Sequence, residues 1–83
     1  MKPSEARKHA LMMRDERTGD IVEVPPPDEM GRGVVIFNGQ VVERCEYSDS
    51  DGGFVKTDNG RIFRGKEWAN HIVEQLRIGA YRI

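Results

Sequence analysis

The chain has 83 residues, of which 33% are charged and 37% hydrophobic, and its formal net charge is -1. A chain of this length forms a single domain and buries only about 60–65% of the surface that its unfolded form exposes, so a partner or a second copy would add stability. The near-zero net charge excludes the overall basic surface of a dedicated nucleic-acid-binding protein.

Charge is unevenly distributed along the chain. Residues 19–53 carry eight acidic and two basic side chains, whereas residues 54–83 carry three acidic and six basic ones. We expect the acidic middle and the basic C-terminal third to pair with each other, primarily within one fold.

The cellular setting follows from cysteine usage and hydropathy. Cys45 is the only cysteine, so no internal disulfide forms and a reducing compartment fits best. No apolar run approaches the roughly 20 residues needed to span a bilayer, and no apolar segment follows the charged start at residues 1–5. The sequence therefore predicts a cytoplasmic protein without a membrane segment.

The first 24 residues contain a predicted helix and a segment with two interpretations. Proline, serine and glutamate at positions 3–5 favour a helix start, and the apolar spacing that follows predicts a helix over residues 4–11. Residues 11–14 and 20–24 then form a hairpin if the turn between them places Gly19 in a bulge, which is the interpretation that we favour. The alternative is one helix that continues through residue 17 and ends at Gly19.

Three consecutive prolines follow this segment. Pro25, Pro26 and Pro27 cannot donate backbone hydrogen bonds and favour an extended polyproline conformation. Residues 25–32 are therefore predicted to connect the N-terminal helix and hairpin to the main unit of the domain.

Three glycine-centred turn signals divide residues 33–64 into short apolar runs. They are Asn38-Gly39, Asp51-Gly52-Gly53 and Asp58-Asn59-Gly60. Asn and Gly reach positive φ at low cost, as tight hairpin loops require, so each signal predicts a reversal of the chain. The pattern predicts an antiparallel β-meander with strands at residues 33–37, 40–47, 54–57 and 61–64.

The longest predicted strand, residues 40–47, has one mostly apolar face. Val41, Cys45 and Tyr47 lie on that face with Glu43 as the exception, and Val42, Arg44 and Glu46 lie on the other. Residues 34–37 are apolar throughout, which favours a strand covered on both faces or covered by a partner.

The segment over residues 66–78 is predicted to be an amphipathic helix. Its apolar side carries Trp68, Ala69, Ile72, Val73 and Leu76. Gly79 ends the helix, and residues 80–83 form either a frayed tail or a short final strand. The predicted fold class is α+β: a small antiparallel meander, a short N-terminal helix, and a C-terminal helix packed on the sheet.

No catalytic, cofactor or metal motif emerges. Residues 49–52 have the alternating carboxylates of a calcium loop, but Gly53, Phe54 and Gly60 stand where the remaining ligands and the required glycine would be. Cys45, His9 and His71 lack metal-ligand spacing. Cys45 lies on the predicted apolar face, and His71 is expected at the rim of the helix.

A weak nucleic-acid signal lies in the C-terminal third. Residues 61–66 interleave basic and aromatic side chains, as proteins that bind single strands do. The alternative to a protein partner is therefore a nucleic-acid-binding regulator that uses Arg61, Arg64, Lys66 and Arg82.

Residues 35–45, followed by Ser48-Asp49 and Gly53-Phe54-Val55, give the order strand, Asn-Gly turn, strand, acidic turn and Gly-aromatic-Val strand. In this order the chain resembles short accessory proteins of tailed phages and prophages. The likeness covers about a third of the chain, and those proteins mostly have no assigned activity, so no functional residue is carried over. The resemblance implies a phage or mobile-element protein in a bacterial cytoplasm.

The leading functional hypothesis is a non-enzymatic module that binds a host or phage protein, alone or as a homodimer, and inhibition of the partner would be one use of such binding. No cofactor is expected. The acidic middle would mimic nucleic-acid phosphates for a basic partner. The residues expected to contact a partner are Asp28, Asp49, Asp51, Arg61, Arg64, Lys66 and Arg82.

Overall fold

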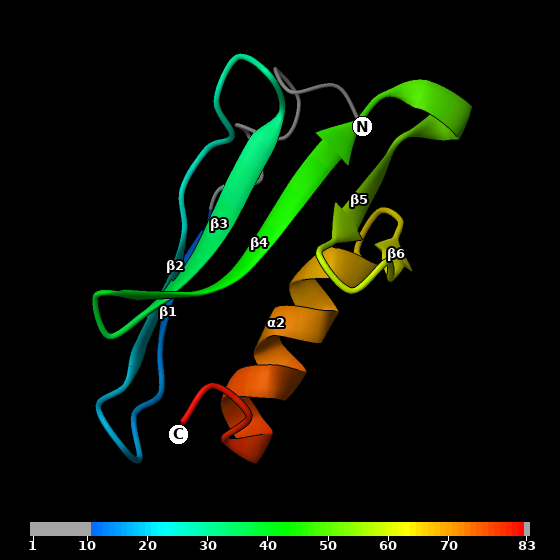
Figure 1. The fold of residues 1–83 in the computed structure, drawn as a ribbon. Coiled ribbons are helices and arrows are strands. Elements are labelled where there is room, and N and C mark those ends of the chain that lie inside the picture. Colours follow the sequence, from blue (N-terminus) through cyan, green and yellow to red (C-terminus); the bar gives the residue numbers. More distant parts are fainter. Residues whose placement is uncertain (1–10, 83) are drawn as a thin grey trace.

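A computed structural model describes residues 11–82 of the chain. These residues form one six-stranded antiparallel sheet and a C-terminal helix (Figure 1). The elements are β1 Leu11–Arg14, β2 Ile21–Val24, β3 Arg32–Phe37, β4 Gln40–Ser48, the short 3-10 turn η2 Ser50–Gly52, β5 Phe54–Thr57, β6 Ile62–Phe63 and α2 Glu67–Ile78. Strands adjacent in sequence are adjacent in the sheet. The predicted α+β class and antiparallel meander are confirmed.

The turn chemistry explains these reversals. Asn38 and Gly39 have φ values of 49° and 87°, so both central residues of the β3–β4 turn adopt the positive φ that a two-residue hairpin loop favours. Gly60 has a φ of 86°, and its N–H donates to the Thr57 carbonyl at 2.9 Å. The residues that predicted the reversals are therefore the residues that make them.

The N-terminal segment forms the favoured hairpin. β1 pairs with β2 in the register Leu11↔Val24, and the Asp15 N–H donates to the Asp20 carbonyl at 2.8 Å to close the loop. Gly19 has a φ of 79°, consistent with the predicted bulge. The alternative of one helix ending at Gly19 is wrong, because the hairpin pairing satisfies the backbone groups that such a helix would use.

The helix predicted over residues 4–11 lies outside the described residues, except that Leu11 is the first residue of β1. The proline-rich loop connects β2 to β3, which are neighbours in the sheet. Asp28 orders this loop, because its carboxylate accepts hydrogen bonds from the N–H groups of Met30 and Arg32, both at 2.9 Å.

A β-bulge in β4 corrects the predicted faces of that strand. The β3–β4 register shifts between Val35 and Ile36, so that Val35 pairs with Glu43 and Ile36 with Val41, which leaves Val42 as the extra residue. An extra residue reverses the side-chain alternation on one side of it. Val42 consequently packs against the core, and Val41, predicted on the buried face, is 47% exposed.

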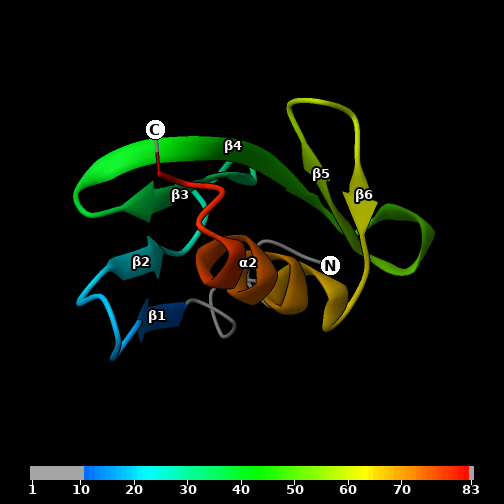
Figure 2. The same ribbon diagram turned by 90° about the horizontal axis from the view of Figure 1, so that it is seen from below.

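The sheet curls around α2, which lies in its concave face (Figure 2). The helix buries Trp68 and Ile72 against the sheet, and the Trp68 indole N–H donates to the Tyr47 hydroxyl at 3.2 Å. Burying each of these side chains contributes about 1.5–3 kcal/mol, a large share of the stability of so small a domain. The prediction that the lone tryptophan joins helix to sheet is confirmed.

The apolar side of the helix is narrower than predicted. Val73 is 45% exposed, because it lies at the margin of the stripe that the curled sheet covers. Gly79 ends the helix with a φ of 74°, as expected. Residues 80–82 of the predicted tail are neither frayed nor a strand, since Tyr81 is buried and its ring lies 5.9 Å from that of Phe37, and residue 83 lies outside the described residues.

Candidate functional site

A polar cluster joins three elements on the concave side of the sheet. Glu43 of β4 lies with one carboxylate oxygen 3.1 Å from Nε2 of His71 on α2, and its other oxygen accepts a hydrogen bond from the Tyr81 hydroxyl at 2.8 Å. Both oxygens of the carboxylate are therefore used within the protein. The cluster fixes the chain after the helix against the middle of the sheet.

His71 is not at the rim, as the sequence predicted. Its side chain is only 9% exposed, and the centre of its ring lies 4.4 Å from that of Phe63 and 5.7 Å from that of Trp68. The curl of the sheet brings β6 over this turn of the helix, which no helical periodicity could indicate.

Burial keeps the hydroxyl of Tyr81 protonated. Removal from water is the main cause that raises the pKa of Tyr81 far above its ordinary value, and the hydrogen bond to Glu43 raises it further. The neutral hydroxyl is the donor in this bond. Through this bond the cluster holds the chain after α2 against β4.

Cys45 is likewise unsuited to nucleophilic chemistry. The side chain is buried, and this burial raises the pKa of the thiol to about 12, with the nearby carboxylates of Glu43 and Asp58 adding to the shift. Since the thiolate is the reactive form, the thiol is inert at neutral pH.

A groove of about 470 Å³ lies beside the polar cluster. Its walls come from β4, the β5–β6 turn, α2 and the chain after the helix, and are formed by Val41, Val42, Glu43, Arg44, Thr57, Asp58, Asn59, Arg61, His71, Gln75, Ala80 and Tyr81. Among the residues expected to contact a partner, the groove contains Arg61 alone.

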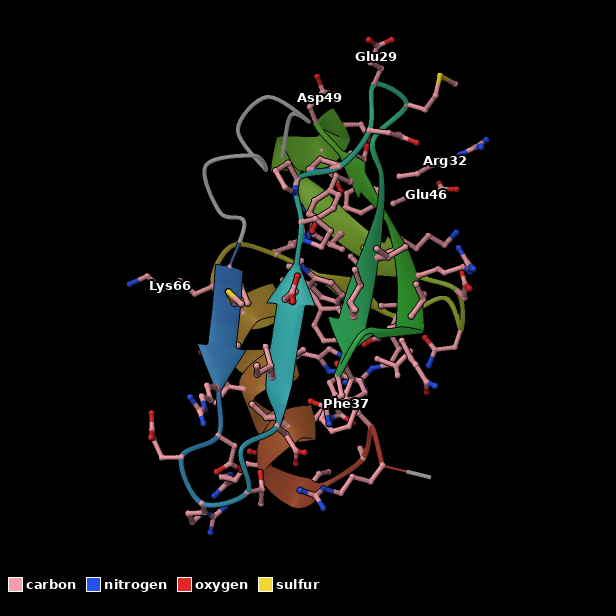
Figure 3. The ribbon with its side chains drawn as sticks, turned by 90° about the vertical axis from the view of Figure 1, so that its left-hand side faces the viewer. Glu29, Arg32, Phe37, Glu46, Asp49 and Lys66 are labelled. Carbon is pink, nitrogen blue, oxygen red and sulfur yellow. The ribbon has the colours of Figure 1, made fainter. Side chains whose placement is uncertain are left out.

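A second candidate surface is the acidic end, which we define as Asp28, Glu29, Glu46 and Asp49. The β2–β3 loop and the β4–β5 turn meet there, because the Tyr47 N–H donates to the Gly31 carbonyl at 2.7 Å. Figure 3 shows Glu29 and Asp49 projecting from this end of the sheet, opposite Phe37. All four acidic residues are exposed.

Met30 adds an apolar element to the acidic end. It follows Glu29 in the loop and is 75% exposed. The only basic side chain in residues 25–32 and 46–53 is Arg32, which stands opposite Glu46 in the sheet and offsets one of the charges. An unbranched, polarizable side chain next to uncompensated carboxylates suits contact with a protein surface.

The acidic residues singled out from the sequence have different environments. The Asp28 carboxylate is occupied by the loop hydrogen bonds, and that of Asp51 lies 2.9 Å from the Arg64 guanidinium. Asp49 is exposed, and its side chain makes no hydrogen bond or ion pair with any residue between 11 and 82. Of the three, Asp49 is the one whose carboxylate has no partner among the described residues.

The basic residues do not form one surface. Arg64 pairs with Asp51, and Arg82 pairs with Asp20. Arg61 lies with its guanidinium 4.9 Å from the centre of the Phe63 ring, and Lys66 stands at the start of α2 on a different side from the acidic end (Figure 3). The expected pairing of the acidic middle with the basic third within one fold is thus confirmed for two arginines.

Asp20 is the centre of a hydrogen-bonded network around the chain after α2. Its carboxylate accepts bonds from the Asn38 amide at 3.0 Å and the Thr18 hydroxyl at 2.8 Å, and it pairs with Arg82. The bond from Asn38 is the largest cause that lowers the pKa of Asp20, followed by that from Thr18.

Within residues 11–82, no three metal-ligating side chains converge, and α2 is too short and too polar to cross a bilayer. No family model matches the chain, and comparisons with curated proteins and with solved structures found no significant match. The candidate surfaces are therefore inferred from the geometry of this structure and not from related proteins.

Sequence reasoning missed two features. Glu43 was noted only as a charged exception on an apolar face, and that exception was the available signal for the polar cluster with Tyr81. Glu29 and Glu46 were not singled out, because their approach to Asp49 depends on the pairing of β3 with β4.

Proposed function

We propose that this protein is a non-enzymatic binding module that acts stoichiometrically on a host or phage protein, as a cytoplasmic accessory protein of a phage or mobile element. The observation that carries the proposal is the acidic end, where exposed carboxylates from two separate segments lie at the same end of the sheet and an exposed methionine follows Glu29 in the loop. Such a surface suits a basic partner, and inhibition follows if the partner uses the same basic surface for nucleic acid.

The state of the reactive side chains supports a binding role. The Cys45 thiol is buried, and the Glu43 carboxylate is held by His71 and Tyr81. Cys45 and His71, the nucleophile and the imidazole that an enzyme would use, thus lie in or against the core of this domain.

The test is affinity capture from bacterial lysate with nuclease present. The variant Glu29→Lys/Asp49→Lys reverses two carboxylates of the acidic end that form no hydrogen bond or ion pair among the described residues. The variant Glu16→Lys/Glu23→Lys makes the same change in net charge at exposed positions elsewhere, in the β1–β2 turn and on β2. Asp28 and Asp51 are left unchanged, because reversing them would disturb the loop and the Arg64 pair.

We expect the wild type and the control variant to capture the same protein and the acidic-end variant to lose it. The captured amount should fall with added salt, because exposed charges are screened. Equal capture by all three proteins would contradict the proposal.

The second function, a nucleic-acid-binding regulator, has weaker support, because Arg64 and Arg82 are already paired with Asp51 and Asp20. Capture that disappears when nuclease is added would favour it. A titration with single- and double-stranded oligonucleotides at two salt concentrations would then measure the salt dependence that phosphate contacts require.

A further inference from the structure

β1 is an edge strand with an open side. It pairs with β2 alone, and no other described strand or helix lies beyond it (Figure 2). Natural edge strands are commonly protected by proline, lysine or a bulge, and the regular strand Leu11–Arg14 contains none of these. The opposite edge of the sheet, β6, is only two residues long. β1 is therefore the edge at which the sheet is able to extend.

The register of the β1–β2 hairpin shows which backbone groups point outward. The Asp15 N–H donates to the Asp20 carbonyl, so these two residues form a hydrogen-bonded pair. Bonded and non-bonded pairs alternate along an antiparallel ladder, so Met13 bonds to β2, whereas the N–H and carbonyl groups of Met12 and Arg14 point away from it. Within residues 11–82, these outward groups have no partner.

Apolar side chains from both layers border this edge. Met12, on the convex face, is 68% exposed. Leu11 and Met13, on the concave side, pack against the core but are only half-buried, because β1 has no neighbour beyond it. Val73 is half-exposed and stands about 200° around α2 from His71, which contacts β4 and β6, so it lies on the side of the helix toward β1.

We propose that β1 pairs with β1 of a second copy of this chain, so that the two sheets join into one. Antiparallel pairing about a two-fold axis at Met13 places Met12 of each copy opposite Arg14 of the other. Every outward backbone group of Met12 and Arg14 is then bonded. A register centred on Arg14 would set two arginines directly opposite each other, and one centred on Met12 would leave Arg14 without a partner in the strand Leu11–Arg14.

The second copy fits this edge in charge as well as in backbone bonding. Arg14 and Glu23 lie on the convex face with Met12, and neither forms an ion pair within residues 11–82. In the proposed register, Arg14 of one copy stands in the same row as Met12 and Glu23 of the other. The joint therefore brings arginines and glutamates together in equal number, while Met13 meets its own copy on the concave side.

The inference goes beyond the proposed capture function, because the joint contains no residue of the acidic end. Capture through the acidic end does not require pairing, so the control variant that carries Glu23→Lys should capture its partner even where its own pairing is weaker. A four-residue strand makes a small contact, and small interfaces are weak, so the tests must detect a weak dimer.

The first test is disulfide trapping of the full chain under mild oxidation. Met13→Cys places two thiols in the non-hydrogen-bonded pair at the two-fold axis, where a Cα–Cα distance of about 4.5 Å lies within the range that a disulfide spans. The control Met12→Cys is at a more exposed position, but the register offsets its two copies. The wild type, whose only thiol is the buried Cys45, gives the background.

We expect Met13→Cys to cross-link at least about tenfold faster than Met12→Cys, although random collision favours the more exposed thiol. A rate for Met13→Cys equal to or below that of Met12→Cys overturns the proposal. The same result is expected if another segment of the chain covers the edge.

The second test is sedimentation equilibrium at up to about 1 mM protein, where we expect the average mass of the wild type to rise toward that of a dimer. Met12→Pro removes an outward N–H but no bond to β2, and proline is tolerated at such edge positions. It should weaken self-association at least about tenfold, whereas Met12→Leu, which keeps the donor, should not. A monomeric wild type, or equal association of the Met12→Pro variant, overturns the proposal.

Capture from lysate separates this inference from the proposed function. Met12→Pro should capture the same protein as the wild type, because the acidic end is intact in it. Loss of capture by Glu29→Lys/Asp49→Lys with unchanged self-association is the expected complementary result. A failure of either property in the wild type leaves the other proposal standing.

Discussion

The two ends of the sheet use the same kinds of charged residue in opposite ways. In the half of the sheet that holds the chain after α2, Asp20 is paired with Arg82 and Glu43 accepts a hydrogen bond from Tyr81. At the acidic end, the side chains of Glu29 and Asp49 make no hydrogen bond or ion pair with another of the described residues. Charges at the first end stabilise the fold, and those at the second are available to a partner. Acidic composition alone does not distinguish these roles.

The largest expected effect is on the reactivity of Cys45, which lies in the core between the two ends. Burial raises the pKa of the Cys45 thiol from 9.0 to about 12, which lowers the thiolate fraction about a thousandfold at neutral pH. We expect a disulfide reagent to modify Cys45 at least about a hundredfold more slowly in native protein than in urea. A spectrophotometric rate measurement tests this, and equal rates in the two states would show that the core is open.

Removing Glu43 should sharpen the contrast between the ends. Glu43→Ala leaves His71 and the Tyr81 hydroxyl without their partner, which costs about 2–3 kcal/mol of unfolding free energy. The control Glu46→Ala, on the exposed face of the same strand, should change it by less than about 0.5 kcal/mol. Urea titrations followed by the fluorescence of Trp68 give both values. Equal losses of unfolding free energy in the two variants would contradict a structural role for Glu43.

Acidification should affect the Asp20 network selectively. The pKa of Asp20 is lowered from its ordinary value of 3.8, so its contribution to stability is present above pH 3.8 and is lost as the pH falls through the lower folded-state pKa. Asp20→Asn should therefore show a smaller loss of stability between about pH 5 and pH 2 than the wild type. Thermal melts across this range test it, and parallel curves would show that Asp20 does not titrate with folding.

The smallest effect is expected at the surface pair of Asp51 and Arg64. Their side chains are 83% and 46% exposed, and such pairs contribute about 0.2–1 kcal/mol. A double-mutant cycle with Asp51→Ala and Arg64→Ala measures the coupling. A coupling energy above about 2 kcal/mol would mean that this pair stabilises the fold as strongly as the Glu43 contacts do, and not weakly as exposed pairs do.

Much of the fold was predictable because local chemistry specified it. The Asn38-Gly39 turn, the start of β5 after Gly53 and the end of α2 at Gly79 each follow from residues that reach positive φ. The burial of Trp68 and Ile72 followed from helical spacing. Such signals lie within a few residues of the structure that they determine.

The errors share a physical origin. Val41 was placed on the wrong face because a bulge arises from the pairing of two strands, and His71 was placed at the rim because β6 covers it only once the sheet has curled. Of the residues expected to bind a partner, Arg64 and Arg82 have internal partners 13 and 62 positions away in sequence. Periodicity within one element contains no information about contacts of this range.

Local signals specified the order of strands, the positions of the turns and the face of α2 that is buried, because these depend on backbone preferences and side-chain spacing along one segment. Long-range packing was needed to establish which charges are neutralised, that Glu29 and Asp49 lie at the same end, and that part of β4 borders an open groove. The reason is that ion pairs and open edges depend on which segments meet, and that is set by the packing of the whole sheet around one helix.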